Sequence, residues 1–475
     1  MKKLLLLLFL GFTLLGFSQN TAIPDPNFEQ ALIDLGLDTA PINGSVPTAN
    51  ISSVTSLDVD NKNIADLTGI EDFTALTGLS CSNNQLTSLD VSNNTALNYL
   101  VCYDNQLTSL DVSSNVVLTF LVCFDNQLTS LDVTNNTALI NLSCGGNQLT
   151  SLDVSQNTAL TLLSCANNQL TSLDVSNNFA LTTLSCGYNQ LTSLDVSNNP
   201  ALTQLYCGGN QLTSLDVSNN AVLTFLFCWT NQLTSLDVTQ NVLLESIGCG
   251  ENQLTSLDVS GAAALAYLSC YSNQLTSLDV TNNIALAYLS CGYNQLTSLD
   301  VSNNTALIAL YCAFNQLTSL DVSANPALTG LNCRDNQLTG LDVRNGNNIN
   351  FTDFDSTNNP DLICIFVDDA SYSTTNWTDI DPASTFVNNE AECALSIGDN
   401  AFELDVTIYP NPTNSYLFVE GNKNPISISI YNLLGAEVIS KSNTDKINVS
   451  ELSNGVYIIK ISDGIGQTDR KFIKN

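Results

Sequence analysis

Cysteine is the residue type in this chain with the widest chemical reach, because a thiol can form disulfides, bind metals or act as a nucleophile. Thirteen of the fifteen cysteines are spaced by 21 residues, at positions 81, 102, 123, 144, 165, 186, 207, 228, 249, 270, 291, 312 and 333. Side chains in register point the same way, and this arrangement disfavours the roughly 90° torsion that a disulfide requires. We therefore expect these thirteen cysteines to be reduced, buried and apolar in role. Metal chelation by them is disfavoured, because no repeat offers two cysteines or any histidine.

The composition argues against an enzyme and against binding to nucleic acid. Histidine is absent, which removes Ser-His-Asp and Cys-His catalysis, histidine zinc sites and histidine pH switches. The chain has 12 Lys plus Arg against 45 Asp plus Glu, and no cation lies between Lys62 and Arg334. A surface so negative repels nucleic acid and anionic membranes.

One aspartate recurs in each repeat and forms a second candidate chemical feature. The series begins with Asp90, Asp111, Asp132, Asp153 and Asp174, and it continues at every twenty-first residue to Asp342. Neighbouring carboxylates about one strand spacing apart repel one another, so something must offset the repulsion. Hydrogen bonds to flanking hydroxyl residues such as Ser109 and Ser113, together with solvation, are the favoured explanation. Bridging by Ca²⁺ is the alternative, since Ca²⁺ prefers oxygen ligands; otherwise we expect no cofactor.

Aromatic residues collect at the positions that vary between repeats, which are those of Tyr99, Val101, Tyr103 and Asp104. Three groups stand out: Tyr99, Tyr103, Phe120 and Phe124; Tyr206, Phe225, Phe227 and Trp229; and Tyr267, Tyr271, Tyr288, Tyr293, Tyr311 and Phe314. Aromatic side chains with acidic neighbours on one face suggest recognition of a protein or a carbohydrate by stacking and hydrogen bonding. The alternative is that parallel strands simply favour aromatic residues at tolerant positions.

These residues are all positioned by one 21-residue repeat that runs about thirteen times from Leu76 to Val343. Each copy has about six inward apolar positions, in the second copy Leu97, Leu100, Cys102, Leu107, Leu110 and Val112. Burial of so few side chains cannot offset the entropy lost when a whole copy is ordered, so one copy alone cannot fold. Stacked copies can, which predicts a solenoid whose stability depends on nearest neighbours.

The repeat divides into halves, Leu97 to Gln106 and Leu107 to Val117, and each reads L-x-x-L-x-(C/V)-x-x-N. This pattern resembles the bacterial leucine-rich repeats whose units carry two short strands. The resemblance implies a mainly β solenoid with two parallel sheets, one from segments such as 99–102 and one from segments such as 109–113. Rungs should lie about 4.8 Å apart.

Asparagine recurs at two corners of each repeat, as at Asn105 and Asn115. A side-chain amide at a tight corner can satisfy buried backbone groups of its own turn and the next one. The second asparagine series breaks at Ala262, where we expect a local irregularity.

The first 73 residues contain an export signal and a cap. Residues 1–18 combine two lysines with an apolar run, which indicates a secretory signal peptide too short to anchor the chain. Residues 19–73 form the expected N-terminal cap, with one helix over 24–36. In that helix Asp25 is the cap, Pro26 takes the first position, and Phe28, Ala31, Leu32 and Leu35 share one face before Gly36.

The array over 74–343 is followed by an expected C-terminal cap over 344–396 and a linker over 397–404. Cys364 and Cys393 are the two cysteines outside the 21-residue spacing. In an exported chain they predict a disulfide that closes this cap.

Residues 405–475 form short alternating runs separated by turns, which predicts a small antiparallel β-sandwich. Four motifs, Ile408–Pro412, Ile430–Gly435, Leu452–Tyr457 and Lys471–Lys474, resemble the C-terminal sorting domain of the type IX (Por) secretion system. The residues that carry the resemblance are Tyr409, Pro410, Asn411, Pro412, Gly435, Gly455, Tyr457 and Lys471. It implies a Gram-negative, Bacteroidota-type source, passage across the outer membrane by that machinery, and removal of the domain on release or surface attachment.

The sequence therefore predicts an exported or surface-displayed leucine-rich-repeat binding protein with no transmembrane segment in its mature form. Its expected role is adhesion to, or capture of, an extracellular protein or glycan. The alternative role is a structural component of a matrix or surface coat, in which the repeats act as a spacer. Fold alone does not identify the ligand.

Overall fold

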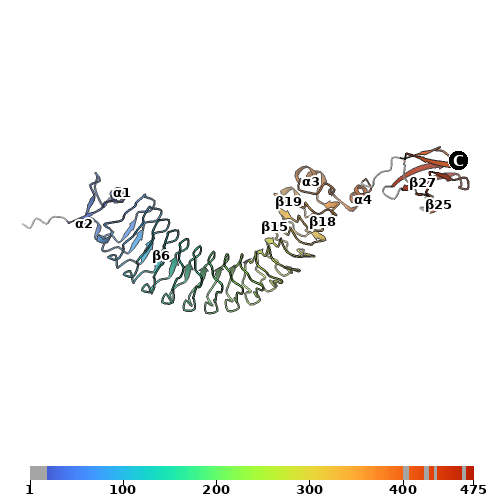
Figure 1. Cartoon of the computed structure of the whole chain (residues 1–475). Helices are drawn as coiled ribbons and strands as arrows, with labels where there is room; N and C mark the ends of the chain where they lie inside the picture. Colours follow the sequence, from blue (N-terminus) through green and yellow to red (C-terminus); the bar gives the residue numbers. More distant parts are fainter. Residues whose placement is uncertain (1–18, 400–405, 422–426, 433–435, 463–466) are drawn as a thin grey trace, which may run out of the picture. The chain divides into compact units, whose positions relative to one another are not determined.

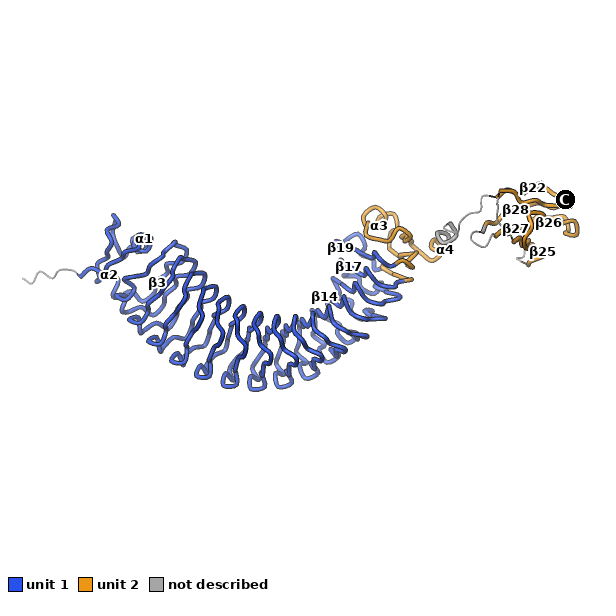
Figure 2. The backbone as a smooth tube through the Cα atoms, viewed as in Figure 1, with its two compact units in different colours: residues 1–338, 345–359 blue, residues 339–344, 360–475 orange. Residues whose placement is uncertain are grey.

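The computed structural model describes residues 19–399, 406–421, 427–432, 436–462 and 467–475. The expected signal peptide over 1–18 and most of the expected linker over 397–404 lie outside these residues. The chain divides into two compact units, Met1–Leu338 with Asn345–Asn359, and Thr339–Arg344 with Pro360–Asn475 (Figure 2). Each unit is described separately below.

A parallel sheet of fifteen strands runs through the first unit. Its strands are β3 (Ser56–Asp58), β4 (Gly78–Ser80), β5 (Tyr99–Val101), β6 (Phe120–Val122), β7 (Asn141–Ser143), β8 (Leu162–Ser164), β9 (Thr183–Ser185), β10 (Gln204–Tyr206), β11 (Phe225–Phe227), β12 (Ser246–Gly248), β13 (Tyr267–Ser269), β14 (Tyr288–Ser290), β15 (Ala309–Tyr311), β17 (Gly330–Asn332) and β19 (Asp353–Asp355). Neighbouring repeats pair in register, so that Tyr99 lies beside Phe120 and Leu100 beside Leu121. The unit curves into an arc with this sheet on its inner side (Figure 1). The first of the two expected sheets is thus confirmed.

The second expected sheet forms over a much shorter stretch than the repeat pattern predicted. At the corresponding repeat position the described residues contain β16 (Ser319–Asp321) and β18 (Gly340–Asp342), and β18 pairs in parallel with β20 (Cys364–Phe366), which pairs with β21 (Thr385–Val387). Residues 109–113 do not form a strand and contribute only an isolated bridge between Asp90 and Asp111. An arc spaces its coils more widely on the outer side, which places most of these outer segments beyond ladder hydrogen bonding.

The core of the solenoid consists of the inward positions that the repeat predicted. Leu97, Leu100, Cys102 and Leu107 are fully buried, and the same positions are buried in the following repeats. All thirteen cysteines of the 21-residue series are buried free thiols. Burial raises the pKa of these thiols, in the case of Cys165 to about 12. They therefore serve as small apolar residues, as expected.

Buried asparagines connect each coil to the next at both corners. The Asn105 amide donates to the carbonyl oxygens of Cys81 (3.0 Å) and Cys102 (3.2 Å), and its oxygen accepts from the Leu86 N–H at 3.0 Å. At the other corner the Asn115 amide donates to the carbonyl oxygen of Val91 at 3.1 Å. Asn105 thus satisfies buried backbone groups of its own coil and of the preceding one, as predicted, whereas Asn115 donates only to the preceding coil, to Val91 and Asn94.

The break at Ala262 keeps the main backbone bond of its corner. The Ala262 N–H donates to Val259 O at 3.0 Å, as the Asn241 N–H donates to Val238 O at 2.9 Å one coil earlier. The expected irregularity consists of a further backbone bond, from the Ala263 N–H to Gly261 O at 3.2 Å, and of a missing side-chain amide. Asn241 donates its amide to the previous coil, whereas Ala262 has no amide to offer to Val238 and Asn241.

A short helix and a two-stranded antiparallel sheet cover the first coil. Helix α1 (Pro26–Asp34) is shorter than the expected 24–36. The Asp25 carboxylate caps it by accepting from the N–H groups of Asn27 and Phe28, and its other oxygen accepts from the backbone of residues 65 and 66. Phe28 is buried as expected, but Leu35 is half exposed because it follows the last helical turn.

The remaining elements of this cap are small. They are β1 (Asn20–Ala22), which pairs antiparallel with β2 (Ser45–Pro47), α2 (Thr48–Ile51) and the 3₁₀ helix Ile70–Asp72. A second 3₁₀ helix, Asn348–Asn350, follows the last repeats. Besides the expected helix, the described residues contain α2 in this cap and two further helices in the second unit, none of which was predicted from the sequence.

The second unit begins with a cap held by a disulfide. Helix α3 (Ala370–Asn376) lies between β20 and β21, and helix α4 (Glu390–Asp399) extends into the range expected for the linker. Cys364 in β20 is bonded to Cys393 in α4, with their Cα atoms 5.8 Å apart. The predicted bridge between these two cysteines is present.

Two antiparallel sheets make up the C-terminal domain. One contains β22 (Thr407–Tyr409), β23 (Tyr416–Glu420) and β26 (Lys446–Asn448), and the other contains β24 (Ser427–Asn432), β25 (Glu437–Ser442), β27 (Gly455–Ser462) and β28 (Gln467–Lys474). Both sheets contribute to one core, with Leu417 and Ile447 from the first and Ile459 and Phe472 from the second. The expected antiparallel β-sandwich is confirmed. Among the described helices of the whole chain, none has the length and apolar character needed to cross a bilayer.

The buried thiols provide a test of the stacked core. We expect a thiol reagent to leave the thirteen cysteines of the 21-residue series unmodified in the native protein and to modify all of them in denaturant, because each is buried and protonated. Mass spectrometry of the labelled chain measures this directly. Rapid modification of Cys207, in the middle of the array, without unfolding would contradict the packing described here.

The missing amide at residue 262 provides a second test. We expect Ala262→Asn to raise the free energy of unfolding by about 1 kcal/mol, because it restores donors to two buried carbonyl groups. Denaturant unfolding followed by circular dichroism measures the change. Ala263→Asn is the matched control, since Ala263 is exposed, and an equal gain in both variants would argue against the corner bond.

Candidate binding site

The inner face of the long sheet carries the positions that vary between repeats. Tyr99 is 41% exposed there, and Tyr103 is half-buried. Val101, expected to be exposed, is only 6% exposed. It lies on its strand between two stacked aromatic pairs, one formed by residues 99 and 120 and the other by residues 103 and 124, and these rings cover it.

Most of the predicted aromatic residues form stacks along the sheet. The ring centroids are 4.8 Å apart for Tyr99–Phe120, 4.4 Å for Tyr103–Phe124, 5.4 Å for Tyr206–Phe227, 4.6 Å for Tyr267–Tyr288 and 4.1 Å for Tyr293–Phe314. Tyr311 continues the third of the predicted groups by contacting Tyr288 at 5.6 Å in a tilted arrangement. Residues at one position of successive repeats are separated by the strand spacing, so their rings meet nearly face to face.

The stacks are interrupted at β12, where a hollow opens. It has a volume of about 340 Å³ and is lined by Tyr188, Phe227, Trp229, Thr230, Gly248, Gly250, Glu251, Tyr267, Ser269 and Tyr271. Four of these residues were predicted from the sequence, namely Phe227, Trp229, Tyr267 and Tyr271. Phe225, on the same strand as Phe227, is not among the lining residues.

Two glycines create this hollow. A Cβ atom on Gly248 would lie 2.6 Å from Cδ1 of Phe227, and one on Gly250 would lie 2.4 Å from Cε1 of Tyr271. The neighbouring rings therefore lean over both positions. Other repeats carry a side chain at the position of Gly248, whereas glycine recurs at the position of Gly250, as at residues 145, 187, 208 and 292. Sequence reasoning followed the aromatic residues and missed these glycines, although two glycines in one copy beside aromatic copies are a visible signal.

A carboxylate lies at the edge of the hollow, and sequence reasoning also missed it. Glu251 Oε1 accepts a hydrogen bond from the Tyr271 hydroxyl at 3.1 Å, and Oε2 accepts one from the Thr230 hydroxyl at 2.7 Å. Burial and the contact with Glu251 raise the pKa of Tyr271. The tyrosine thus remains a hydrogen-bond donor, and the carboxylate is held in one orientation.

Thr230 and Glu251 adopt an unfavourable backbone conformation at this edge. Their φ angles are 51° and 52°, and the same corner is left-handed in the other repeats. In the first repeats it is occupied by Asn83, Asp104, Asp125, Gly146 and Asn167, and later by Tyr188, Gly209, Thr230, Glu251, Ser272, Tyr293, Phe314 and Asp335. Asparagine, aspartate and glycine tolerate this conformation, whereas bulky or β-branched residues are strained in it. The later repeats therefore accept a conformational cost to place larger side chains on this face.

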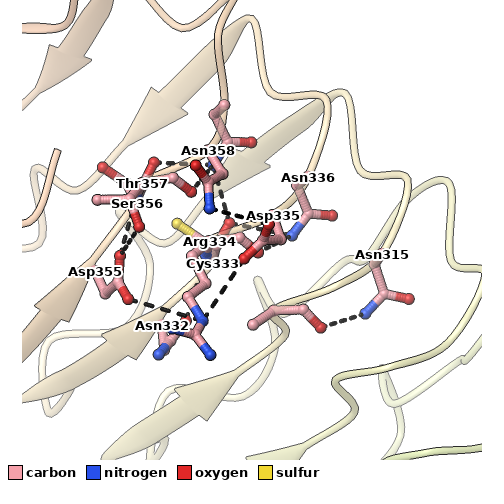
Figure 3. Close-up of polar contacts among 12 residues, drawn as sticks. Asn315, Asn332, Cys333, Arg334, Asp335, Asn336, Asp355, Ser356, Thr357 and Asn358 are labelled. Atoms are coloured by element: carbon pink, nitrogen blue, oxygen red, sulfur yellow. Dashed lines mark hydrogen bonds and ion pairs between the residues drawn. The ribbon is translucent and has the colours of Figure 1, made fainter. Parts of the chain in front are cut away.

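The far end of the same face holds an arginine over an aromatic ring. The guanidinium carbon of Arg334 lies 5.0 Å from the centre of the Phe314 ring. Its Nε atom is 3.7 Å from Asp335 Oδ2 and 3.9 Å from Asp355 Oδ2 (Figure 3). This face can therefore hold a cation by combining a ring with carboxylates.

The aspartate series has local hydrogen-bond partners. Asp111 Oδ1 accepts from the Ser113 N–H at 2.9 Å, and Asp132 Oδ1 accepts from both the N–H and the hydroxyl of Thr134. These bonds lower the pKa of both aspartates, as the equivalent bonds do at residues 90, 153 and 174. Within the described residues no three acidic, cysteine or histidine side chains are grouped so that they could hold a metal ion.

The predicted sorting residues meet at one edge of the C-terminal sandwich. The Asn411 amide donates to the carbonyl oxygen of Lys471 at 3.0 Å, and its oxygen accepts from the Ile473 N–H at 2.9 Å. Tyr409 stacks on Phe418, and Tyr457 stacks on Phe472, at 5.6 Å in each case. The first motif is thus fastened to the terminal strand, and Gly455 opens β27. Gly435 lies outside the described residues.

Comparison with known families assigns both parts of the chain. Residues 407–475 match the family model described as a secretion system C-terminal sorting domain, and residues 180–220 match the model described as leucine-rich repeats in two copies. A segment of 77 residues is 39% identical to Internalin J of Listeria monocytogenes serotype 4b (strain F2365). That segment covers 16% of this chain and 8% of the curated relative, so only a small part of that protein is matched.

Solved structures extend the similarity over most of the chain. The functional domain of InlJ from Listeria monocytogenes, which is described as including a cysteine ladder, is 32% identical to this chain with a TM-score of 0.69. The match covers 96% of this chain and 99% of that one. The internalin InlF of the same species is 23% identical with a TM-score of 0.56, covering 71% of this chain and 95% of that chain. YopM of Yersinia pestis is 23% identical with a TM-score of 0.54, covering 70% and 93%. The last two similarities concern the fold alone.

The aspartate series gives a prediction about calcium. Because each of these carboxylates is held by its own local hydrogen bonds, we expect the melting temperature to be the same in millimolar calcium chloride as in a chelator. Differential scanning calorimetry of the chain measures it. A calcium-dependent rise in the melting temperature that disappears in Asp132→Asn would favour cation bridging between coils instead.

Proposed function

We propose that this chain, which belongs to the leucine-rich-repeat proteins and ends in a secretion system sorting domain, captures an extracellular protein or glycan through the inner face of its long sheet. It would do so without catalysis, after export by the type IX machinery of a Gram-negative bacterium. It would act at the cell surface or after release. The expected signal peptide over 1–18 accounts for the first step of that export.

The observation that carries the proposal is the hollow over β12. Aromatic rings line it, a carboxylate lies at its edge, and it occupies the face where repeats differ from one another. Large aromatic side chains with a few oriented polar groups are typical of binding sites. The inward positions barely change between repeats, so the variation lies where a ligand would touch and not where coils pack.

The second candidate function is a structural component of a matrix or surface coat. The stacked ring pairs favour it, because in a pair such as Tyr293 and Phe314, with ring centroids 4.1 Å apart, each ring has one face covered by the other ring and closed to a ligand. In that role the aromatic residues would stiffen the sheet and the repeats would act as a spacer. The hollow distinguishes the two proposals, since a spacer has no need of two glycines that open a space beneath rings.

The chain from residue 19 to 475 tests the proposal when it is applied to a glycan array and to an array of purified extracellular proteins. We expect reproducible binding to a limited set of targets. Replacing Phe225, Phe227 and Trp229 by Ser should weaken that binding at least about tenfold, a loss of about 1.4 kcal/mol, because two of the three rings line the hollow.

A matched control replaces three exposed apolar residues outside the inner face, Phe179, Val222 and Val242, by Ser. This variant should bind as the parent chain does, and circular dichroism should show both variants folded. If the parent binds nothing on either array, or if both variants bind like the parent, the result would contradict capture by this face and would favour the spacer role.

A further inference from the structure

We infer that the hollow over β12 receives the guanidinium group of an arginine side chain presented by a partner protein. This inference rests on the proposed function and deepens it, because it names the chemistry of the group that enters. Three features carry it: the ring faces left open at the hollow, the oriented carboxylate of Glu251, and the arrangement around Arg334 on the same sheet.

The rings on either side of the hollow stack on a ring of the next coil away from it. The interplanar angles are 8° for Tyr267–Tyr288 and 3° for Tyr206–Phe227. Across the gap at β12, Phe227 meets Trp229 at 68° and Tyr267 at 50°. Two stacks therefore end at the hollow, and a ring at the end of a stack keeps one face without a stacking neighbour. Aromatic faces attract cations, and arginine most often.

Glu251 adds a charge that has no counterpart in its own repeats. Its two oxygens are oriented by the hydroxyl groups of Thr230 and Tyr271, and each oxygen keeps a lone pair for a further donor. The sequence has no lysine or arginine from residue 63 to residue 333, and the whole chain carries a formal net charge of −33. Glu251 is exposed, so a cationic partner group could pair with its carboxylate, whereas a neutral group would leave the carboxylate without a cation.

The Arg334 site shows how this sheet holds such a group. There a guanidinium lies over the Phe314 ring. The carboxylates of Asp335 and Asp355 lie beside this guanidinium (Figure 3). The hollow has the same two components, rings and a carboxylate, but no lysine or arginine is among the described residues that line it. Its volume of about 340 Å³ is at the lower end of small-molecule sites, which suits one side chain better than an extended ligand.

Backbone strain at the same two residues supports selection for this arrangement. Thr230 and Glu251 both occupy left-handed corners, where glycine or asparagine would be favoured. Either replacement would relieve the strain but would lose the hydrogen bond that orients the carboxylate. A structural role for this corner gives no reason to keep a β-branched residue and a glutamate in it.

Titration of Trp229 fluorescence tests the inference on the chain from residue 19 to 475. The probes are three blocked tripeptides that carry arginine, lysine or citrulline between two glycines, the last being the uncharged counterpart of arginine. We expect a saturable change with the arginine peptide that weakens as salt is added, a smaller effect with lysine and none with citrulline. The change should vanish in Trp229→Phe, which leaves Trp377 as the remaining tryptophan of the two.

Glu251→Gln should weaken binding of the arginine peptide at least about tenfold, the size expected when the charged partner is lost. Glu245→Gln is the matched control, because it removes the same charge from the same coil at an exposed residue that does not line the hollow. Isothermal titration calorimetry gives both affinities without reliance on fluorescence. In a Thr230→Gly variant the carboxylate loses one of its two donors, and its affinity for the arginine peptide should lie between the affinities of Glu251→Gln and Glu245→Gln.

Equal binding of citrulline and arginine peptides, or equal affinities of Glu251→Gln and Glu245→Gln, would overturn the inference. A neutral methyl glycoside that changes Trp229 fluorescence regardless of Glu251 would overturn it in favour of a sugar. In either case the proposed function survives if the Phe225, Phe227 and Trp229 variant still loses its array targets. If that variant keeps them while the arginine peptide binds at Glu251, the inference stands and the wider proposal fails.

Discussion

The hydrogen bonds that buried asparagine side chains form between coils are the constraint on which the rest of this solenoid depends. A coil of 21 residues must turn sharply at both ends of its inner strand, and those turns bury backbone groups that no strand can pair. Asn105 and Asn115 pair them with their amides, and each bond reaches the preceding coil. An unpaired buried polar group costs about 1 to 3 kcal/mol, so the corners fix the repeat length. Once the length is fixed, leucines and cysteines fall on the inside of every coil.

The same fixed register determines what the outer positions can do. Residues such as Tyr267 and Tyr288 lie directly beside each other on adjacent strands. The strand spacing alone therefore brings their rings into stacking contact. A site that needs an open ring face must therefore interrupt the stack. Gly248 and Gly250 supply that interruption, and the rings on either side turn toward the space. The hollow lies where the coil of β12, which has no aromatic residue on this face, separates coils that carry them.

The periodic features of this molecule were predictable from the sequence, and the features that depend on curvature or ring orientation were not. The long sheet, the inward residues and the corner asparagines follow from the repeat itself, and the Cys364–Cys393 bond follows from two cysteines outside it. The second sheet was overestimated, because the pattern of Leu110 and Val112 predicts a strand without revealing that the arc separates neighbouring coils on its outer side. The helix over 24–36 was predicted too long, because the apolar spacing placed Leu35 on the buried face of the helix although the helix ends at Asp34. Glu251 was missed because a single glutamate among changing residues has no periodic signal, and its role depends on Thr230 one coil away.

Strain at the corners is tolerable here because of how a solenoid distributes stability. Each inner coil is stabilised chiefly by its two neighbours, so a cost of about 1 to 2 kcal/mol at one left-handed residue is borne by a coil packed on both sides. Tyr188, Thr230 and Glu251 all lie in such coils, between β9 and β13, whereas the first coils keep Asn83 and Asp104 at the same corner. Coils packed on both sides also carry residues that suit the conformation, as at Asn167 and Gly209. The packing of a coil therefore permits a larger side chain at this corner without requiring one, and Tyr188, Thr230 and Glu251 are placed where they line the hollow.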